Sequence, residues 1–392
     1  MKFVIGWVLV FFIIGSLNLD AQWVTAYKRG IIELKPDAAF AKKTQWDDIL
    51  YNSVEDITIA QDGTIFMTQG HENRLHIVSS AGDLSKTFSR FGEGPGDVYS
   101  PASLSILDGK YLVVGEYAER HRISIFDLSG KFVKIVKTKH APFQPIALKN
   151  NKIAYLTHQF LNPKTIEKVK KVKVLIYIKD IMTGSENLVE SIDLIQRRAS
   201  SGENGLVLTS GSDLAHITRT INNNLLVGAT NRNFLNIFDE TGKRLKTFSL
   251  NLKPIPVTGD YIAKYKKQIL DSVDKNVPRS NREFFRSILK NASFSDCFGS
   301  TLPLFSSILV DSDGNILVFK QKVDPDSNND FFQVYSFDGV FTCETQLKWG
   351  EFKPVNLSRG NGIQFTKTGI VGIFEIDLKD DTIYKLMKFN PR

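Results

Sequence analysis

Charged and imidazole side chains gather in three short stretches of this 392-residue sequence, each just after an apolar segment. Carboxylates accept hydrogen bonds, guanidinium groups donate them in a planar fork, and imidazole can do either. Together they suit a sugar, a peptide or a ligand that carries a carboxylate. The same residue types on exposed loops also form weak surface ion pairs that bind no ligand. The candidate binding residues are His71, Arg74, Glu116, Arg120, His121, Arg122 and Arg232.

Motifs that would assign a reaction are missing from the sequence. No Gly-x-Ser-x-Gly turn, which presents the nucleophile of many hydrolases, occurs. Asp311 and Asp313 begin a stretch like a calcium loop, but Lys322 stands where the closing Glu of such a loop is needed, so we expect a turn. We therefore assign no catalytic residue and no metal ligand, and the cofactor stays open.

The chain has two cysteines, Cys297 and Cys343, whose spacing fits no Cys-x-x-Cys metal site. In an oxidising compartment they can form one disulfide bond. They can equally pack as small apolar side chains. We favour two free cysteines over a disulfide.

The elements that would position the candidate residues repeat along the chain. Each repeat begins with an apolar strand, a tight polar turn and a second apolar strand, as in the stretch 57–67. Asp-Gly and Asn-containing pairs supply the positive φ angles that hairpin turns need. These turns fall at Asp62-Gly63, Asp108-Gly109, Asn150-Asn151, Asn223-Asn224, Asp313-Gly314 and Thr368-Gly369.

A second hairpin follows each of the first five turns. Its two strands are joined by a glycine turn, as in the stretch 123–136 around Gly130. Four antiparallel strands in sequence form one blade of a β-propeller. The pattern predicts an all-β fold, a six-bladed β-propeller spanning residues 22–392.

The last repeat lacks a fourth strand, because the chain ends soon after the stretch 382–389. A spare strand, Gly30 to Lys35, precedes the first repeat. An unpaired strand edge exposes backbone donors and acceptors. We therefore predict that Ile31 to Lys35 supplies the outer strand of the last blade and closes the ring.

Two gaps between repeats are longer than the others. The first contains the lysine-rich stretch 162–174, which we interpret as a long strand connection. The second is an insertion at about 257–300, where 261–273 and 281–291 have helical apolar spacing on either side of Pro278. The sequence predicts a small helical pair, which either only packs on one face or forms a lid or partner surface.

The stretch 88–101, FSRFGEGPGDVYSP, resembles the connection between blades in NHL-type repeats and their bacterial six-bladed relatives, the TolB-like propeller superfamily. The resemblance implies a six-bladed propeller. Members of these families include binding scaffolds and a few enzymes, so the resemblance leaves function open. Gln69, Glu116 and Ala229 stand where the family commonly has Asp, so no metal or ligand role is carried over from it. The matching residues are Gly92, Gly94, Pro95, Gly96 and Pro101 in the connection, with Asn73, Arg74, Arg122, Phe126, Asp127 and Gly130 after the second strands.

The start of the chain has the layout of a secretory signal peptide. Lys2 gives a positive start, an apolar run extends from Phe3 to Ile14, and Ala21 precedes Gln22. The run is shorter than the roughly 20 residues of a membrane-spanning helix. We expect cleavage after residue 21, no stable membrane span afterwards and a periplasmic or secreted protein. An uncleaved N-terminal anchor is the alternative.

The net charge of +8 is spread along the chain, and no nucleic-acid reader motif is present, so nucleic-acid binding is excluded. We expect an exported, non-catalytic binding or scaffold protein that recognises a small molecule, a glycan or a protein. The alternative is a hydrolase or lyase at the mouth of the channel, with a metal held by ligands from several blades. A third possibility is a protein that docks a partner through the 257–300 insertion.

Overall fold

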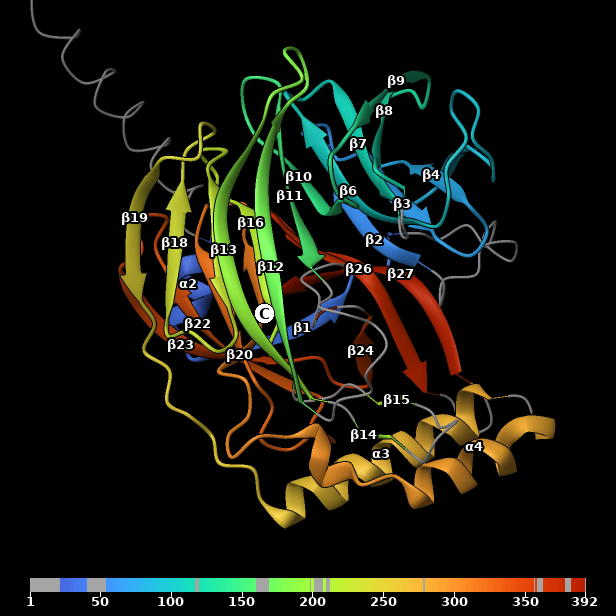
Figure 1. The fold of residues 1–392 in the computed structure, drawn as a ribbon, viewed down its shortest axis with the longest axis vertical. Coiled ribbons are helices and arrows are strands. Elements are labelled where there is room, and N and C mark those ends of the chain that lie inside the picture. The colour runs from blue at the N-terminus through green and yellow to red at the C-terminus, as the bar shows by residue number, and fades with distance from the viewer. Residues whose placement is uncertain are drawn as a thin grey trace, which may run out of the picture.

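The computed structural model of the chain is mostly β, with its sheets in a propeller-like arrangement (Figure 1). The sheets are connected in chain order and fan out around a common centre. The structure describes residues 22–40, 54–116, 120–159, 169–197, 199–200, 207–208, 212–277, 279–355, 357, 362–377 and 382–391, so the proposed signal peptide, 1–21, lies outside the described residues.

Four sheets each contain four antiparallel strands that follow one another in sequence. The first contains β2 (Val54–Ile59), β3 (Ile65–Gln69), β4 (Arg74–Val78) and β5 (Leu84–Phe88). The second contains β6 (Pro101–Leu107), β7 (Tyr111–Glu116), β8 (Arg122–Asp127) and β9 (Phe132–Lys137). The third contains β10 (Phe143–Ala147), β11 (Lys152–Gln159), β12 (Val169–Asp180) and β13 (Glu186–Arg197). The fourth contains β16 (Ala215–Arg219), β17 (Leu225–Ala229), β18 (Phe234–Phe238) and β19 (Arg244–Ser249).

Burial within a sheet follows the position of the strand. Every residue of β3 is buried, whereas no residue of β5 is. Second strands such as β3 are covered by neighbouring sheets, so even the polar Thr68 and Gln69 are buried, whereas fourth strands such as β5 face solvent. The predicted turns are present: Asn150 and Asn151 have φ values of +59° and +57°, and Gly130 has +80°. These are left-handed conformations, which Gly and Asn adopt more readily than other residues.

Nine further strands form one sheet. Within it, β20 to β23 are antiparallel in chain order, and β25, β26, β27 and β1 form a second antiparallel group. Short strand β24 also pairs with β26. The strands are β20 (Phe305–Val310), β21 (Ile316–Lys320), β22 (Asn329–Tyr335), β23 (Phe341–Lys348), β24 (Phe352–Pro354), β25 (Ile363–Thr366), β26 (Gly369–Asp377), β27 (Thr382–Pro391) and β1 (Ile31–Pro36).

Strand β1 joins the two groups of the nine-stranded sheet. Leu34 and Lys35 pair antiparallel with β27, as predicted for an N-terminal closing strand. Ile31 and Ile32 pair parallel with β23, which the sequence did not predict. A single N-terminal strand therefore covers the edges of both groups.

Helix α2 (Gln22–Lys28) precedes β1 and was not predicted. Its Trp23 and Tyr27 are fully buried in the core of the nine-stranded sheet. Trp23 Nε1 donates to Thr366 O at 2.7 Å, and Tyr27 Oη donates to Asp311 Oδ2 at 2.8 Å. Thr366 is the last residue of β25, and Asp311 directly follows β20. Helix α2 is therefore hydrogen-bonded to both antiparallel groups and fixes them to each other.

Apolar clusters lie between successive sheets, and one of them joins the first sheet to the last. The first and second sheets share a cluster, as do the second and third, the third and fourth, and the fourth and β20–β23. Ile57 of the first sheet shares a cluster with Ile373 of β26. The sheets are therefore packed into a closed ring.

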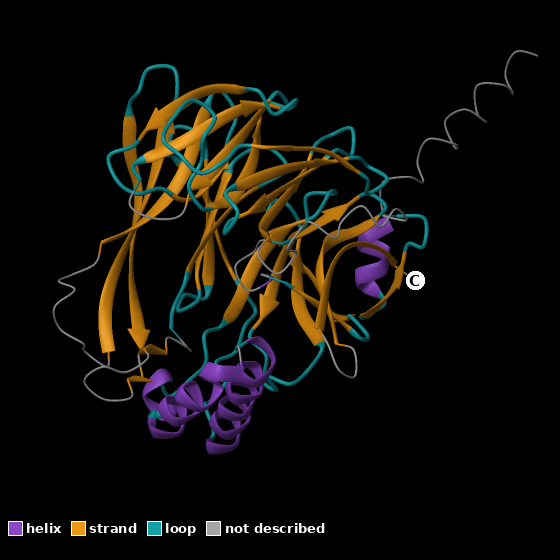
Figure 2. Ribbon diagram, turned by 90° about the vertical axis from the view of Figure 1, so that its right-hand side faces the viewer, coloured by secondary structure: helices purple, strands orange, loops and turns teal. Residues whose placement is uncertain are grey.

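The long insertion contains α3 (Gly259–Asn276), α4 (Arg279–Asn291) and the short 3₁₀ helix η2 (Phe294–Cys297), so both predicted helices are present. Thr258 caps α3, since its side chain accepts a hydrogen bond from Tyr261 N at 3.2 Å. The helices lie at one end of the molecule, near the small hairpin β14 (Ala199–Ser200) and β15 (Val207–Leu208) (Figure 2). Among the described residues, no helix is both long and apolar enough to cross a membrane.

Both cysteines are free. Cys297 is buried in η2, whereas Cys343 is only partly buried in β23. The sequence-based preference for two free cysteines agrees with these positions.

Candidate functional site

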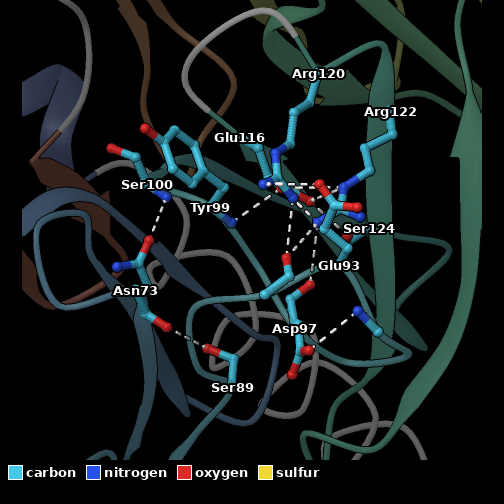
Figure 3. A network of polar contacts seen from close by, with 12 residues as sticks. Asn73, Ser89, Glu93, Asp97, Tyr99, Ser100, Glu116, Arg120, Arg122 and Ser124 are labelled. Atoms are coloured by element: carbon cyan, nitrogen blue, oxygen red, sulfur yellow. Dashed lines mark hydrogen bonds and ion pairs between the residues drawn. The ribbon is translucent and has the colours of Figure 1, made fainter.

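Three of the predicted binding residues belong to one cluster around Glu116, at the end of β7 (Figure 3). Arg122 Nε lies 3.0 and 3.1 Å from the two Glu116 carboxylate oxygens, and its Nη2 lies 2.9 Å from Oε2. Ser124 Oγ and Tyr99 N donate to the same carboxylate at 2.8 and 3.0 Å. The Glu116 side chain is 0% exposed and that of Arg122 is 12% exposed. The carboxylate is therefore already saturated by groups of the protein.

The cluster also holds the glycine-rich connection between the first two sheets. Arg120 Nη1 donates to Gly92 O at 2.9 Å, and its guanidinium lies 4.7 Å from the Tyr99 ring centre. Asp97 Oδ2 accepts a hydrogen bond from Gly94 N at 3.0 Å inside the connection. A Cβ atom at Gly92 would collide with the Asp97 carboxylate, which explains the glycine there. The contacts give Arg120 and Arg122 a role in positioning this connection (Figure 3).

Arg232 takes part in a similar link between the third and fourth sheets. Its Nη1 lies 2.8 Å from Glu190 Oε1, with side-chain exposures of 28% and 10%. Asn236 Nδ2 donates to the same carboxylate at 3.1 and 3.2 Å. Arg232 is thus partly open to solvent at one end of an ion pair.

His71, Arg74 and His121 are exposed and do not belong to these links. His71 O accepts a hydrogen bond from Asn73 Nδ2 at 3.3 Å, and His121 O accepts one from Thr138 N at 3.0 Å. Within the described residues, no contact brings either imidazole into the Glu116 cluster. Their role in ligand binding stays a prediction.

A cavity of about 330 Å³ lies where the first strands of the repeats converge. Strands β2, β6, β10, β16, β20 and β25 all contribute to its wall. The cavity reaches the turns after β16 and β20, which lie at the opposite end of the strands from His71 and His121. Its main polar side chains are those of Asp56, Thr58, Ser105, His216, Arg219 and Gln364.

Two titratable groups of the cavity wall have strongly shifted pKa values. Burial raises the pKa of Asp56 to about 7, although the backbone N–H groups of Ile57 and Leu104 donate to its carboxylate at 2.8 and 2.7 Å. Burial lowers the pKa of His216 to about 4. Within the described residues, His216 Nε2 has no hydrogen-bond partner, and the residue is 4% exposed. Both groups are therefore largely uncharged near pH 6.

Arg219 extends from β16 towards the second and third sheets. Its Nη1 donates to Ile106 O at 2.8 Å and to Ala147 O at 3.4 Å. Burial lowers the pKa of its guanidinium, while the charge of Asp108 acts in the opposite direction. In the part of the chain that the structure describes, no carboxylate lies within ion-pair distance of Arg219.

A groove of about 690 Å³ lies between α3 and one end of the nine-stranded sheet. It is partly built from the β21–β22 connection, which is equivalent to the connections that carry His71 and His121. The groove therefore lies at the end of the strands where ligand binding was predicted. Gln268 of α3 contacts this connection, donating to Pro325 O at 3.3 Å. The aromatic lining residues are Tyr261, Tyr265, Trp349 and Phe352.

Polar groups alternate with these rings in the groove. Asp330 accepts a hydrogen bond from Trp349 Nε1 at 2.6 Å and pairs with Lys322 at 3.3 Å. Asp271 and Asp326 are exposed in its wall. The groove thus offers apolar rings beside hydrogen-bond acceptors.

The sequence also suggested a metal-dependent alternative. Over the described ranges, no three His, Cys, Asp or Glu side chains are grouped so that they could hold a metal ion. Asp311, which begins the calcium-like stretch, accepts hydrogen bonds from Tyr27 Oη and Asn315 Nδ2 at 2.8 Å each. The stretch forms the turn between β20 and β21, as predicted.

The cavity residues were missed because the first strands were treated as apolar structural elements. The stretches 54–59 and 215–219 carry Asp56 and His216, each directly before an apolar Ile. A buried polar side chain interrupting an innermost strand is the signal that identifies these positions. Arg219 is the last residue of β16 and so does not interrupt an apolar stretch. The sequence therefore gives no signal that it lines the cavity.

No protein-family model and no curated protein matches the sequence. A solved structure of a member of the DUF4221 family from Bacteroides vulgatus is 10% identical, with a TM-score of 0.52 over 93% of this chain and 99% of that one. Virginiamycin B lyase from Staphylococcus aureus is 12% identical, with a TM-score of 0.42 over 92% and 99%. A gluconolactonase from Xanthomonas campestris is 9% identical, with a TM-score of 0.43 over 92% and 94%. The first of these similarities supports the fold, which is that of a β-propeller-like protein.

Proposed function

We propose that this chain is an exported six-bladed β-propeller that binds a glycan, without turnover, in the groove between α3 and the nine-stranded sheet. The observation that carries the proposal is the groove itself, since its volume of about 690 Å³ falls within the usual range of ligand sites. Sugars present apolar C–H faces and hydroxyl edges. Partly exposed rings such as Phe352 and acceptors such as Asp326 suit both features.

The blade count of six rests on how the nine-stranded sheet divides. Among the described strands, its two antiparallel groups are paired with each other only through the parallel pairing of β1 with β23. Counting each group as one blade adds two blades to the four separate sheets. The cavity wall supports this count, because six first strands contribute to it.

Export is supported by the basic start and apolar run of residues 1–21. Expression of the full-length chain in a bacterium, followed by cell fractionation and N-terminal sequencing, tests it. We expect a periplasmic or secreted chain beginning at Gln22. Recovery of an uncleaved chain in the cytoplasm would contradict export.

Glycan binding is tested with a glycan array, followed by calorimetry on the best ligand. Asp271→Asn and Asp326→Asn should each weaken binding about 10- to 100-fold, since each removes a charged hydrogen-bond acceptor. The matched control is Asp193→Asn on β13, whose side chain is 81% exposed and outside the groove. Equal affinities for all three variants, or no saturable glycan binding, would overturn the proposal.

The second candidate is a hydrolase or lyase. The specific observation in its favour is that the shifted groups Asp56 and His216 share one cavity, as perturbed titratable groups often do in active sites. Conversion of a bound compound, lost on replacing either residue, would favour it. Unchanged glycan recovered after prolonged incubation would favour non-catalytic binding.

A further inference from the structure

The groove under α3 has more carboxylates than lysines among its described lining residues. Its charged residues are Asp271, Lys322, Asp326, Asp330, Lys353 and Glu375. Lys322 Nζ lies 3.3 Å from Asp330 Oδ1, and Lys353 Nζ lies 3.7 Å from Glu375 Oε1. Each lysine is therefore paired with one carboxylate of the same wall. The wall keeps two further negative charges, although the chain as a whole has a net charge of +8.

The two remaining carboxylates, Asp271 and Asp326, lie beside one contact between α3 and the β21–β22 connection. In this contact Gln268 Nε2 donates to Pro325 O at 3.3 Å. Asp271 follows Gln268 by three residues, so it lies on the same side of the helix, about 5–6 Å away. Asp326 directly follows Pro325. Both aspartates are exposed, and neither is within ion-pair distance of a described Lys or Arg.

Two like charges from distant segments thus line one space, and a cation placed between them would be attracted by both. We propose that the ligand of this groove is a glycan with a free amino sugar, whose ammonium group is held between Asp271 and Asp326. The inference rests on the glycan binding proposed above and adds the class of sugar. An ammonium group has three N–H donors, enough for both carboxylates. Charge-assisted hydrogen bonds are stronger than neutral ones, so the pair favours an amine over a hydroxyl.

The rest of the lining favours an amino sugar over a metal ion or a lysine side chain. A calcium ion takes about six to eight oxygen ligands, and over the described ranges no three acidic, His or Cys side chains are grouped to hold a metal. A lysine carries its ammonium on a flexible chain. The partly exposed rings of Tyr265 and Phe352 instead offer apolar faces that match the C–H faces of a sugar ring.

The experiment is calorimetric titration of residues 22–392 with chitosan, chitin and cellulose oligosaccharides of equal length, at mildly acidic pH. The three share one backbone and differ at the second ring carbon, which carries an amine, an acetamide or a hydroxyl. We expect chitosan to bind about 10- to 100-fold more tightly than the other two. Added salt should weaken chitosan binding and leave cellulose binding nearly unchanged, because it screens exposed charges. Equal affinities for all three would overturn the amine assignment.

Variants test the two carboxylates directly. Asp271→Asn and Asp326→Asn should each weaken chitosan binding about 10- to 100-fold and cellulose binding less than about threefold, because Asn keeps the shape and loses the charge. Asp326→Glu keeps the charge and should retain part of the preference for chitosan. The control Asp193→Asn, at a side chain that is 81% exposed and outside the groove, should change none of the affinities. Equal weakening of all three oligosaccharides by the Asn variants would mean that these carboxylates do not recognise an amine.

The same titrations separate amine recognition from glycan binding in general. Cellulose or chitin binding at least as tight as that of chitosan would leave the groove a glycan site without selection for an amine. Tighter binding of a short lysine peptide than of chitosan would assign the groove to a peptide and contradict both proposals. If none of the three oligosaccharides bound while the glycan array showed another ligand, the amine assignment would be wrong and glycan binding would stand.

Discussion

Arg122 and Arg219 are both largely buried arginines in propeller strands, yet their surroundings differ in one respect. Arg122 forms a bidentate pair with the saturated carboxylate of Glu116. Among the described residues, Arg219 donates hydrogen bonds to the carbonyls of Ile106 and Ala147 and to no carboxylate. The comparison teaches that burial of a charged residue does not identify a binding site. Whether the described protein holds a carboxylate at hydrogen-bond distance from the guanidinium is the more informative property.

The largest of the expected effects is the loss of stability when Arg122 is replaced. Arg122→Met should lower the free energy of unfolding by about 3–5 kcal/mol, because it leaves the buried Glu116 carboxylate without its partner. Urea unfolding followed by tryptophan fluorescence measures this loss. The control is Arg90→Met, whose side chain is 84% exposed in its pair with Asp97, and it should cost less than about 1 kcal/mol. Equal losses for the two variants would remove the structural role given to Arg122.

The next effect concerns pH and the cavity. Burial lowers the pKa of His216 from 6.5 to about 4, so on acidification the unfolded chain binds the proton before the folded chain does. The stability that depends on neutral His216 is complete above about pH 6.5 and is lost as pH falls towards about 4. Between about pH 7.5 and 4.5 the wild type should lose about 2–3 kcal/mol more than His216→Gln.

Unfolding curves of both proteins at a series of pH values test this difference. His71→Gln serves as the control, because it makes the same substitution at an exposed histidine. Parallel stability profiles for the wild type and His216→Gln would mean that His216 is not buried as a neutral group.

A smaller effect is expected where an arginine pair is partly open to solvent. Arg232→Met should cost about 1 kcal/mol, since Arg232 is 28% exposed and water screens its pair with Glu190. The loss should shrink further in high salt, which weakens exposed pairs more than buried ones. A loss of unfolding free energy as large as that of Arg122→Met would mean that the Arg232–Glu190 pair stabilises the fold as much as the Glu116 cluster does.

The smallest change in stability is expected at Arg219. Arg219→Met removes a partly buried charge, which is favourable, but also removes its attraction to Asp108 and two hydrogen bonds to carbonyls, which is unfavourable. The free energy of unfolding should therefore stay within about 1 kcal/mol of the wild type. A loss of several kcal/mol would mean that Arg219 is as structural as Arg122.

Local sequence patterns predicted most of the strands and turns. The Asp-Gly and Asn-Asn turns depend on conformations that neighbouring residues impose, so Asn150 and Asn151 have positive φ values as expected. The helical spacing around Tyr261 likewise predicted α3. The pairing of Leu34 and Lys35 with β27 followed from matching a spare strand with a missing one.

Other features depended on contacts between distant segments and were not predicted. Helix α2 is only seven residues long, and Trp23 and Tyr27 stabilise it through residues about 300 positions away. The candidate residues were chosen by type, and type does not distinguish Arg122 from Arg219. Whether such an arginine pairs with a carboxylate depends on which residue of a neighbouring strand lies beside it. A single sequence does not show which residues lie side by side.

The seam formed by α2 and β1 also bears on how the molecule is made. The segment Gln22–Pro36 is synthesised well before its partners in β27, which lie about 350 residues later in the chain. Contacts so distant in sequence form slowly, because a long loop must close first. The ring therefore closes only after β27 has been made, so the strands between β2 and β26 are already synthesised when the two ends meet.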